Sequence, residues 1–447
     1  MNDTERLLEA TKALVEGRAD NRDENVFDEA HPADIAVVFR QLALAEQVTI
    51  FRTLSPERAG AVLSEMDDHA LLELVRALDE VEVSRILDEM PAEHAADVVE
   101  ELPSEQAEKI LDLMEEEKSE EVQEILEYPE ASAGRLMSPD YVAVPESATV
   151  EQAIEHIRKS ISEERAFELY VVDPHGHLVG VVPLRRLLIA DPASPVFAIR
   201  DEDVVSVPAE MDQEEVARVV AKYDLVAVPV VDQRNRLVGT IAVDDVIDIV
   251  GEEASEDIFR IAGSDAAELE RRSPRQIALM RLPWVLATLV IELFAGVVIH
   301  YFDQTLSRVI LLASFMPVIQ AISGNTGLQS VTMVVRGLAT GQVQLARWWE
   351  PLRRQMQTST ILGGVCGVVV GIIGLIWHSP AFGLIVAVSM FVSVNLSGVA
   401  GTTFPMLSKR LGFDPALTAG PFETAFQDVL GVTIFLSLAT ALLHWLA

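Results

Sequence analysis

The chain has 447 residues, with 70 acidic and 34 basic side chains and a formal net charge of −36 at pH 7. One hydrophobic core rarely organises a chain of this length, so we expect two or more domains. Such an acidic excess argues against nucleic acid and anionic lipid surfaces as partners of the acidic part, because both would repel it. The one cysteine, Cys366, lies in an apolar stretch, which excludes a disulfide framework or a cysteine metal site within one chain.

The negative charge is confined to the first part of the chain. Residues 275–447 contain six acidic and nine basic side chains, which leaves 64 of the acidic and 25 of the basic ones before position 275. Cations are the natural ligands of such a surface, and solubility alone is the other interpretation. The first residues, MNDTERLLEATKALVEG, show no basic segment followed by an apolar one, so we expect no cleaved signal peptide.

Long apolar segments occur only after Pro283. They cover residues 283–302, 306–335, 356–378, 381–407 and 420–446. Each approaches or exceeds the roughly 20 residues that span a bilayer, so five transmembrane helices are predicted. The second contains Pro317 and the small polar run SGNTGLQS, with Gly324, Asn325 and Gly327, which predicts a helix break on a transport path; a kink packed on neighbouring helices is the alternative.

Basic side chains predict the orientation of these spans. They cluster in alternate loops, at Arg271, Arg272, Arg275 and Arg281, at Arg347, Arg353 and Arg354, and at Lys409 and Arg410. The positive-inside bias therefore places the N-terminus in the cytoplasm and the C-terminus outside.

A twelve-residue period runs through residues 42–114. Its equivalent places are held by Leu42, Leu54, Met66, Leu78, Met90, Leu102 and Met114. Helix-start signals such as Ser55-Pro56 precede the apolar stripes, so the sequence predicts a stack of short helices forming a superhelix. No motif in this region indicates catalysis.

A second repeat has an offset of 59 residues. YVVDPHGHLVGVVPLRRLL at 170–188 matches PVVDQRNRLVGTIAVDDVI at 229–247, and each copy predicts a strand, a turn, a strand and a helix start. The upstream halves also agree, with four extra residues in the first copy. This pattern resembles cystathionine-β-synthase-type (CBS) modules, which pair in tandem; the resemblance implies sensing of a nucleotide or an ion.

The order of these segments resembles that of the MgtE family of magnesium transporters and channels. The expected domains are an acidic helical-repeat domain (1–134), tandem CBS modules (135–194 and 195–249), an acidic connecting helix (250–275) and a five-helix membrane domain (276–447). FMPVIQAISGNTGLQSVTMVVRGLATG at 315–341 resembles the second membrane helix of that family. NLSGVAGTTFPMLSKRLGFDPALTAGPFETAFQDVLG at 395–431 resembles its fourth and fifth. The resemblance implies a multi-pass protein of the inner membrane of a prokaryotic cell, with an all-α superhelical domain, an α/β CBS pair and an α-helical membrane domain.

Asp428 is the strongest candidate for an ion-binding residue. It falls two turns into the fifth expected span, and an ionisable side chain at membrane depth is costly and usually functional. Gly420 and Thr424 precede it at i−8 and i−4 and share its helix face. The resemblance implies that Asp428 binds the ion in the pore of a homodimer, where two such carboxylates suit a hydrated Mg²⁺. The alternative is a buried acid paired to another helix.

Two other acids lie in the expected spans. Glu423 is interpreted as a charge at the cytoplasmic mouth or as a residue at the level of the lipid headgroups. Glu292, in the middle of the first span, is given no role.

The resemblance further implies that Mg²⁺ is both cargo and regulator. Mg²⁺ bound between facing carboxylates would draw the acidic domains together and close the pore. The expected sensor carboxylates are Glu93, Asp97, Glu214, Asp224, Asp245, Asp248, Glu253, Glu256 and Asp257. ATP binding to the CBS pair stays open, as do Mn²⁺ or Co²⁺ as cargo and a membrane sensor that does not transport.

Enzymatic alternatives lack their motifs. The sequence contains no His-Glu-x-x-His helix of an intramembrane metalloprotease and no Gly-x-x-x-x-Gly-Lys-Ser/Thr loop of a nucleotide-driven pump. We therefore expect a transporter rather than an enzyme.

Overall fold

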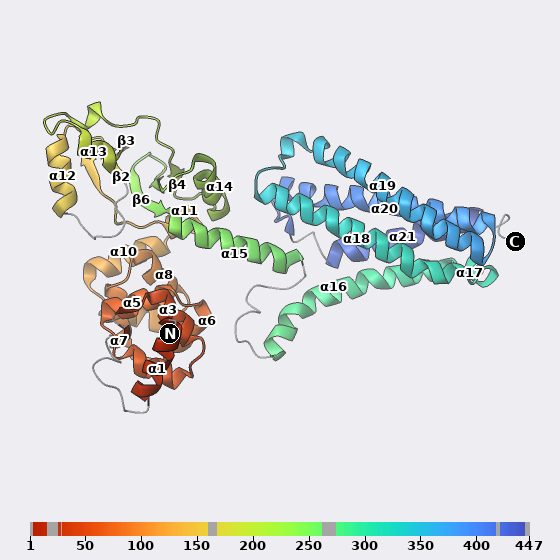
Figure 1. Ribbon diagram of the computed structural model, residues 1–447, viewed down its shortest axis with the longest axis horizontal. Helices are drawn as coiled ribbons and strands as arrows, with labels where there is room; N and C mark the ends of the chain where they lie inside the picture. Colours follow the sequence, from red (N-terminus) through yellow and green to blue (C-terminus); the bar gives the residue numbers. More distant parts are fainter. Residues whose placement is uncertain are drawn as a thin grey trace. The chain divides into compact units, whose positions relative to one another are not determined.

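The structure is a computed structural model that describes residues 3–15, 26–27, 29–159, 168–261, 274–416 and 421–442. It divides into two compact units, Met1–Val250 and Gly251–Ala447 (Figure 1). Each unit is described by itself.

The first unit begins with short helices that start twelve residues apart. After α1 (Asp3–Val15) these are α3 (Pro32–Phe39), α4 (Leu44–Phe51), α5 (Pro56–Ser64), α6 (Asp68–Ala77), α7 (Glu80–Asp88), α8 (Ala92–Glu100), α9 (Ser104–Leu113) and α10 (Glu116–Leu126). Polar caps fix several starts: Ser55 accepts from the Arg58 amide and Asp79 from the Glu82 amide.

Each of these helices packs mainly on the helix two places along. Thus α3 contacts α5, α5 contacts α7 and α7 contacts α9, while α4 contacts α6 and α8 contacts α10. The period-twelve residues from Leu54 to Met114 are all buried at the ends of the helices. The prediction of one short helix per period is confirmed.

The rest of this unit is a pair of α/β modules. The first contains β1 (Ala143–Pro145), α12 (Val150–Lys159), β2 (Glu168–Val172), β3 (Leu178–Pro183) and α13 (Leu184–Ile189); the second contains β4 (Val207–Pro208), α14 (Gln213–Tyr223), β5 (Ala227–Val231), β6 (Leu237–Ala242) and the start of α15 (Val243–Ile261). In each sheet the first two strands are parallel and the last two antiparallel. The repeat predicted from the 59-residue offset is confirmed.

The β2–β3 and β5–β6 turns have the same construction. Asp173 and Asp232 accept backbone N–H groups of their own turns, and Gly176 and Asn235 adopt positive φ angles of 83° and 61°. The hydrogen bond from His177 lowers the pKa of Asp173 to about 2. Tight turns of this kind hold the two sheets against each other, where the Tyr170 hydroxyl meets Thr240 Oγ1 at 2.8 Å.

The second unit is a bundle of long helices. They are α16 (Pro274–Tyr301), α18 (Leu312–Ala339), α19 (Trp349–Trp377), α20 (Pro380–Arg410) and α21 (Pro421–Ala441), with the short α17 (Asp303–Arg308) between the first two. Helix α20 contacts α18, α19 and α21, while α16 packs on α21 (Figure 1). Phe382, Val386, Phe435 and Leu436 are part of its core.

Among the described residues, three of these helices are long and apolar enough to cross a membrane: α16, α19 and α20. Helix α21 has a shorter apolar stretch, Ala425–Ala441. Helix α18 contains the polar side chains of Gln320, Asn325 and Gln329 within its length. The described helices therefore confirm a helical membrane region but not five spans.

The break predicted in the second span is wrong. Helix α18 continues without interruption from Leu312 to Ala339, with Pro317 inside it and Gly324, Asn325 and Gly327 all helical. Pro317 lies near the N-terminal end of the helix, where it removes one hydrogen bond without ending the helix. Gly327 allows close packing instead: a Cβ on it would meet Ser397 Oγ of α20 at 2.8 Å.

Glycines also bring α19 against α20, which gives a direct test of the packing. A Cβ on Gly367 would lie 2.8 Å from the Ala387 carbonyl oxygen, whereas a Cβ on Gly364 meets nothing within 4 Å. We expect Gly367→Ala to push the helices apart and to destabilise the bundle by roughly 1–3 kcal/mol. Gly364→Ala is the matched control and should be neutral or slightly stabilising.

Thermal unfolding of the full chain in detergent measures both variants. Equal melting temperatures for the two would show that the α19–α20 contact does not limit stability.

Candidate functional site

Two carboxyl groups meet in the apolar bundle. The carboxyl groups of Asp428 on α21 and Glu292 on α16 face each other closely enough to interact, and both side chains are partly exposed at the surface of the chain. Two carboxyl groups approach this closely only when a proton or a cation lies between them, because two bare negative charges repel. The pair is therefore a natural place for a positive charge.

Sequence reasoning found one member of this pair and missed the other. Asp428 was predicted as the ion-binding acid, and Glu292 was given no role although it interrupts an apolar span. An acid within an apolar span was the signal that could have identified Glu292. Its pairing with Asp428 could be recognised only from the contact between α16 and α21. Gly420 lies outside the described residues, as does the side chain of Thr424.

The interpretation of Glu423 as a mouth charge is wrong. Its side chain is 0% exposed, in the first turn of α21, and a Cβ on Gly327 of α18 would overlap its carboxylate. Packing against α18 and α20 places it in the interior of the bundle, which the position near a span end did not reveal.

One predicted sensor acid lies beside a buried arginine in the first unit, and a second is buried on the same helix. Arg135, on α11 (Ala133–Leu136), donates to Glu100 Oε2 at 2.5 Å and to the Ala96 carbonyl at 3.2 Å. Asp97 lies 3.5 Å from the same guanidinium group, and Glu93 is 4% exposed on the same helix, α8. Asp97 thus already has a positive partner.

Two of the four acids predicted in the second module accept hydrogen bonds from protein groups. Glu214 accepts from Arg218 at 2.8 Å, and Asp245 accepts from the Ala242 amide at 3.3 Å. Asp224 ends α14 in a left-handed conformation, with φ of 53°. Asp248 is exposed on α15.

Helix α15 also carries Glu253, Glu256 and Asp257 near its C-terminal end. Arg260 forms ion pairs with Glu256 and with Asp414, which lies between α20 and α21. Burial raises the pKa of Glu256 against the opposing effect of Arg260. Within the described part of the chain, no three acidic, histidine or cysteine side chains are grouped closely enough to hold a metal ion.

The end of α15 is attached to the helical bundle. Ile261 packs against Val331 and Val335 of α18 and against Ala416. With the Arg260–Asp414 ion pair, this contact joins α15 to α18 and to the turn before α21.

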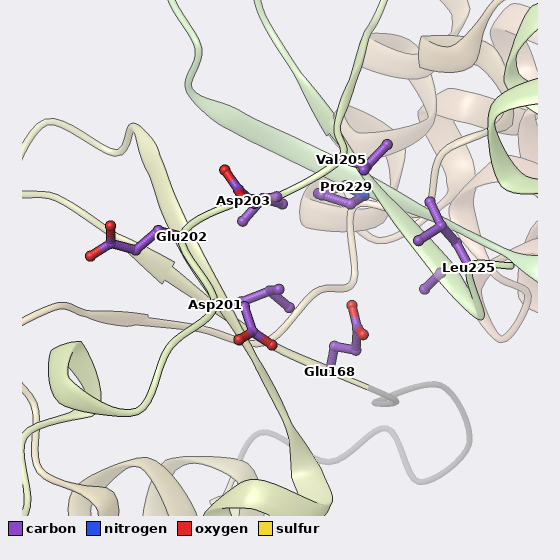
Figure 2. Close-up of a pocket in the computed structure, with 10 residues that line it drawn as sticks. Glu168, Asp201, Glu202, Asp203, Val205, Leu225 and Pro229 are labelled. Carbon is purple, nitrogen blue, oxygen red and sulfur yellow. The ribbon is translucent and has the colours of Figure 1, made fainter. Parts of the chain in front are cut away.

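A pocket of about 410 Å³ lies between the two α/β modules (Figure 2). Asp201, Glu202 and Asp203 come from the segment that links the modules, and Glu168 at the start of β2 is directed into the same space as Asp201. Burial, and then the charge of Asp201, raise the pKa of Glu168. The other wall is apolar, with Val205, Leu225 and Pro229.

Known families match the helical repeat, the two α/β modules and most of the helical bundle. Residues 30–131 match the MgtE intracellular N domain, residues 133–192 and 196–252 match CBS domains, and residues 316–438 match a family described as a divalent cation transporter.

Named relatives and solved structures agree with these matches. The chain is 34% identical over 423 residues to the magnesium transporter MgtE of Bacillus subtilis, covering 94% of each chain. It is 34% identical over 322 residues to MgtE of Thermus thermophilus, covering 71% of each. The cytosolic domain of the Mg²⁺ channel MgtE in complex with ATP aligns with a TM-score of 0.52 at 35% identity, covering 54% of this chain and 99% of that one.

The soluble part of a magnesium transporter aligns with a TM-score of 0.53 at 28% identity, covering 57% of this chain and all of that one. The resemblance found in the sequence is thereby confirmed, including the tandem CBS domains and the membrane helices. The chain belongs to the MgtE family of magnesium transporters.

Proposed function

We propose that the chain carries Mg²⁺ across the cell membrane through a homodimeric pore that rising cytoplasmic Mg²⁺ closes. The observation that carries this proposal is the Asp428–Glu292 carboxyl pair in the apolar bundle. Mg²⁺ keeps most of its water and is commonly held by one or two carboxylates, which this pair supplies. Oxygen ligands favour a hard cation, and flux of Mn²⁺ or Co²⁺ without Mg²⁺ would replace the proposed cargo.

The exposed apolar face of α16 is an argument for a second subunit. Leu286, Leu289, Leu293 and Phe294 are exposed around Glu292, so one copy alone would present a pair of carboxyl groups directly to lipid. Charge at the bilayer centre is costly, and a second copy packed over this face would enclose both pairs near a common axis.

The attachment of α15 to the bundle supports the proposed gate. Sensor acids such as Asp245 and Asp248 lie on the same helix as Arg260, so binding that repositions α15 would act on α18 and on the turn before α21. Mg²⁺ needs only a higher affinity for the closed arrangement. Several weak sites acting together would make closure steep, which suits a region without a grouped metal site among its described residues.

The pocket between the two α/β modules is the proposed binding site for a nucleotide. A relative's cytosolic domain was solved with ATP, and the apolar wall here suits a base. The four carboxylates oppose a triphosphate, so Mg²⁺ would have to accompany the phosphates of ATP.

The pore acids give the first test of transport. We expect Asp428→Asn to abolish Mg²⁺ flux into proteoliposomes, because the amide cannot balance the charge of the ion. Glu292→Gln should reduce flux roughly tenfold, which corresponds to about 1.4 kcal/mol in the barrier. Asp303→Asn, at an exposed acid on α17, is the matched control and should leave flux unchanged. Normal flux in Asp428→Asn would refute the pore assignment.

The attachment of α15 gives a test of the gate. We expect Arg260→Asp to weaken inhibition by Mg²⁺ on the sensor side, because the repelled Asp414 releases the end of α15. The exchanged pair, Arg260→Asp with Asp414→Arg, should restore inhibition. Arg347→Asp, at an exposed arginine, controls for net charge. Inhibition that survives in the single variant, or in a chain lacking residues 1–250, would contradict gating through α15.

The raised pKa of Glu168 predicts how ATP binding depends on pH. A carboxyl with a raised pKa takes up its proton at a higher pH than an ordinary glutamate, so repulsion of the phosphates falls first at this residue. We expect ATP affinity of the full chain to rise as the pH is lowered from 7 to 5, measured by calorimetry. Glu168→Gln should bind more tightly at pH 7 and lose most of the pH dependence. Glu151→Gln, at an exposed glutamate on α12 that does not line the pocket, is the control. An unchanged pH dependence in Glu168→Gln would place the nucleotide elsewhere.

A further inference from the structure

The fully buried carboxylate of Glu423 has no role in the proposed pore pair. Within the described part of the chain, its oxygens accept at most a weak hydrogen bond from the Gln427 side-chain amide; residues 417–420 and the side chains of Pro421, Phe422 and Thr424 lie outside the description. The side chain lies between α18 and α20, against Gly327 and Ser397. An uncompensated charge in such a place would cost several kcal/mol, so something must balance it.

The surroundings of Glu423 offer oxygen lone pairs and few hydrogen-bond donors. The Ser397 hydroxyl donates to the Ser323 carbonyl, and the Ser323 hydroxyl donates to the Ile319 carbonyl, so both hydrogens point away from Glu423. The Gln427 amide, one turn along α21, lies beside the carboxylate and donates weakly to the Ser397 carbonyl at 3.4 Å. The region therefore offers oxygen atoms to a cation but few hydrogen-bond donors to the Glu423 carboxylate.

A row of hydroxyl groups continues from this point along α20. Ser389, Ser393 and Ser397 follow one another at four-residue spacing and are at most 2% exposed. The hydroxyls of Ser389 and Ser393 have no hydrogen-bond partner in the structure, and Gly431 of α21 packs near Ser393. Carboxylate and hydroxyl oxygens gathered in one occluded place suit a hard cation.

We propose that Glu423 is the anionic centre of an occluded sodium site inside each subunit, with Ser397 Oγ as a further ligand. One carboxylate balances one positive charge, whereas Mg²⁺ would leave a net charge in the interior and would have to give up its tightly held water to enter. A cation satisfies both Glu423 oxygens and Ser397 Oγ together. A proton on Glu423 would leave most of these lone pairs without a partner.

The position of Glu423 in its helix also favours the ionised form. It lies in the first turn of α21, where the helix dipole stabilises a negative charge. Asp428 lies five residues further along α21, on a different face, and pairs with Glu292. Sodium at Glu423 thus joins α18, α20 and α21 without occupying the proposed Mg²⁺ site.

Thermal unfolding of the purified full chain tests this proposal without any transport measurement. We expect the melting temperature to rise saturably in NaCl relative to choline chloride of equal ionic strength, and equilibrium binding of ²²Na⁺ to reach about one ion per subunit. Glu423→Gln keeps the shape of the side chain and removes the charge. It should lose sodium binding and the sodium-dependent shift, and in choline chloride it should be at least as stable as the native chain.

Three further variants separate the alternatives. Ser397→Ala should need about tenfold more sodium, whereas Glu350→Gln, at an exposed glutamate, should behave like the native chain. Asp428→Asn should keep the sodium-dependent rise in melting temperature even if Mg²⁺ flux is lost. The sodium site is thus tested independently of the proposed pore. A native chain that is indifferent to sodium, a sodium shift that persists in Glu423→Gln, or a Glu423-dependent shift caused by MgCl₂ or pH but not by NaCl would each overturn the proposal.

Discussion

The cost of carrying carboxylates inside an apolar helical bundle governs the architecture of the second unit. Glu292, Asp428 and Glu423 are its membrane acids, and each lies against another helix rather than against bulk solvent. Such charges persist only where proton, cation or donor compensation is built in. Small residues of α18 and α20, such as Gly327 and Ser397, let the helices approach the Glu423 carboxylate closely. Larger side chains would separate the oxygen atoms that a bound cation must contact at the same time.

The first unit, Met1–Val250, carries most of its acids in contact with water. Its acids lie on exposed faces of short helices and modules, where water lowers the cost of each charge and where arginines already neutralise several of the predicted sensor carboxylates. Asp97 and Glu214 illustrate this, paired with Arg135 and Arg218. A cation that binds there must compete with an existing ion pair, so binding at any one of these positions would be weak.

Local periodicity explains what the sequence could predict. The twelve-residue and 59-residue repeats depend on side chains that are neighbours in the chain, and the structure reproduces both in its helix starts and its strands. Asp428 could be selected because an acid in an apolar span is conspicuous. The burial of Glu423, the partnership of Glu292 and the continuity of α18 through Pro317 could not be predicted, because each depends on a helix that is distant in sequence.

Helix α15 begins in the second α/β module and ends against the helical bundle. It is a continuous helix of 19 residues, about 28 Å long at 1.5 Å per residue, with buried Val246 and Ile249 near its start and Arg260 and Ile261 at its end. A helix of this length transmits displacement because bending it would break backbone hydrogen bonds, whereas moving it as a body costs only its end contacts. Those contacts are one ion-pair network and one apolar patch, which are small enough to be exchanged for a second arrangement. Under the proposed gate, a modest difference in cation affinity between two arrangements of the first unit would be sufficient to bias the bundle.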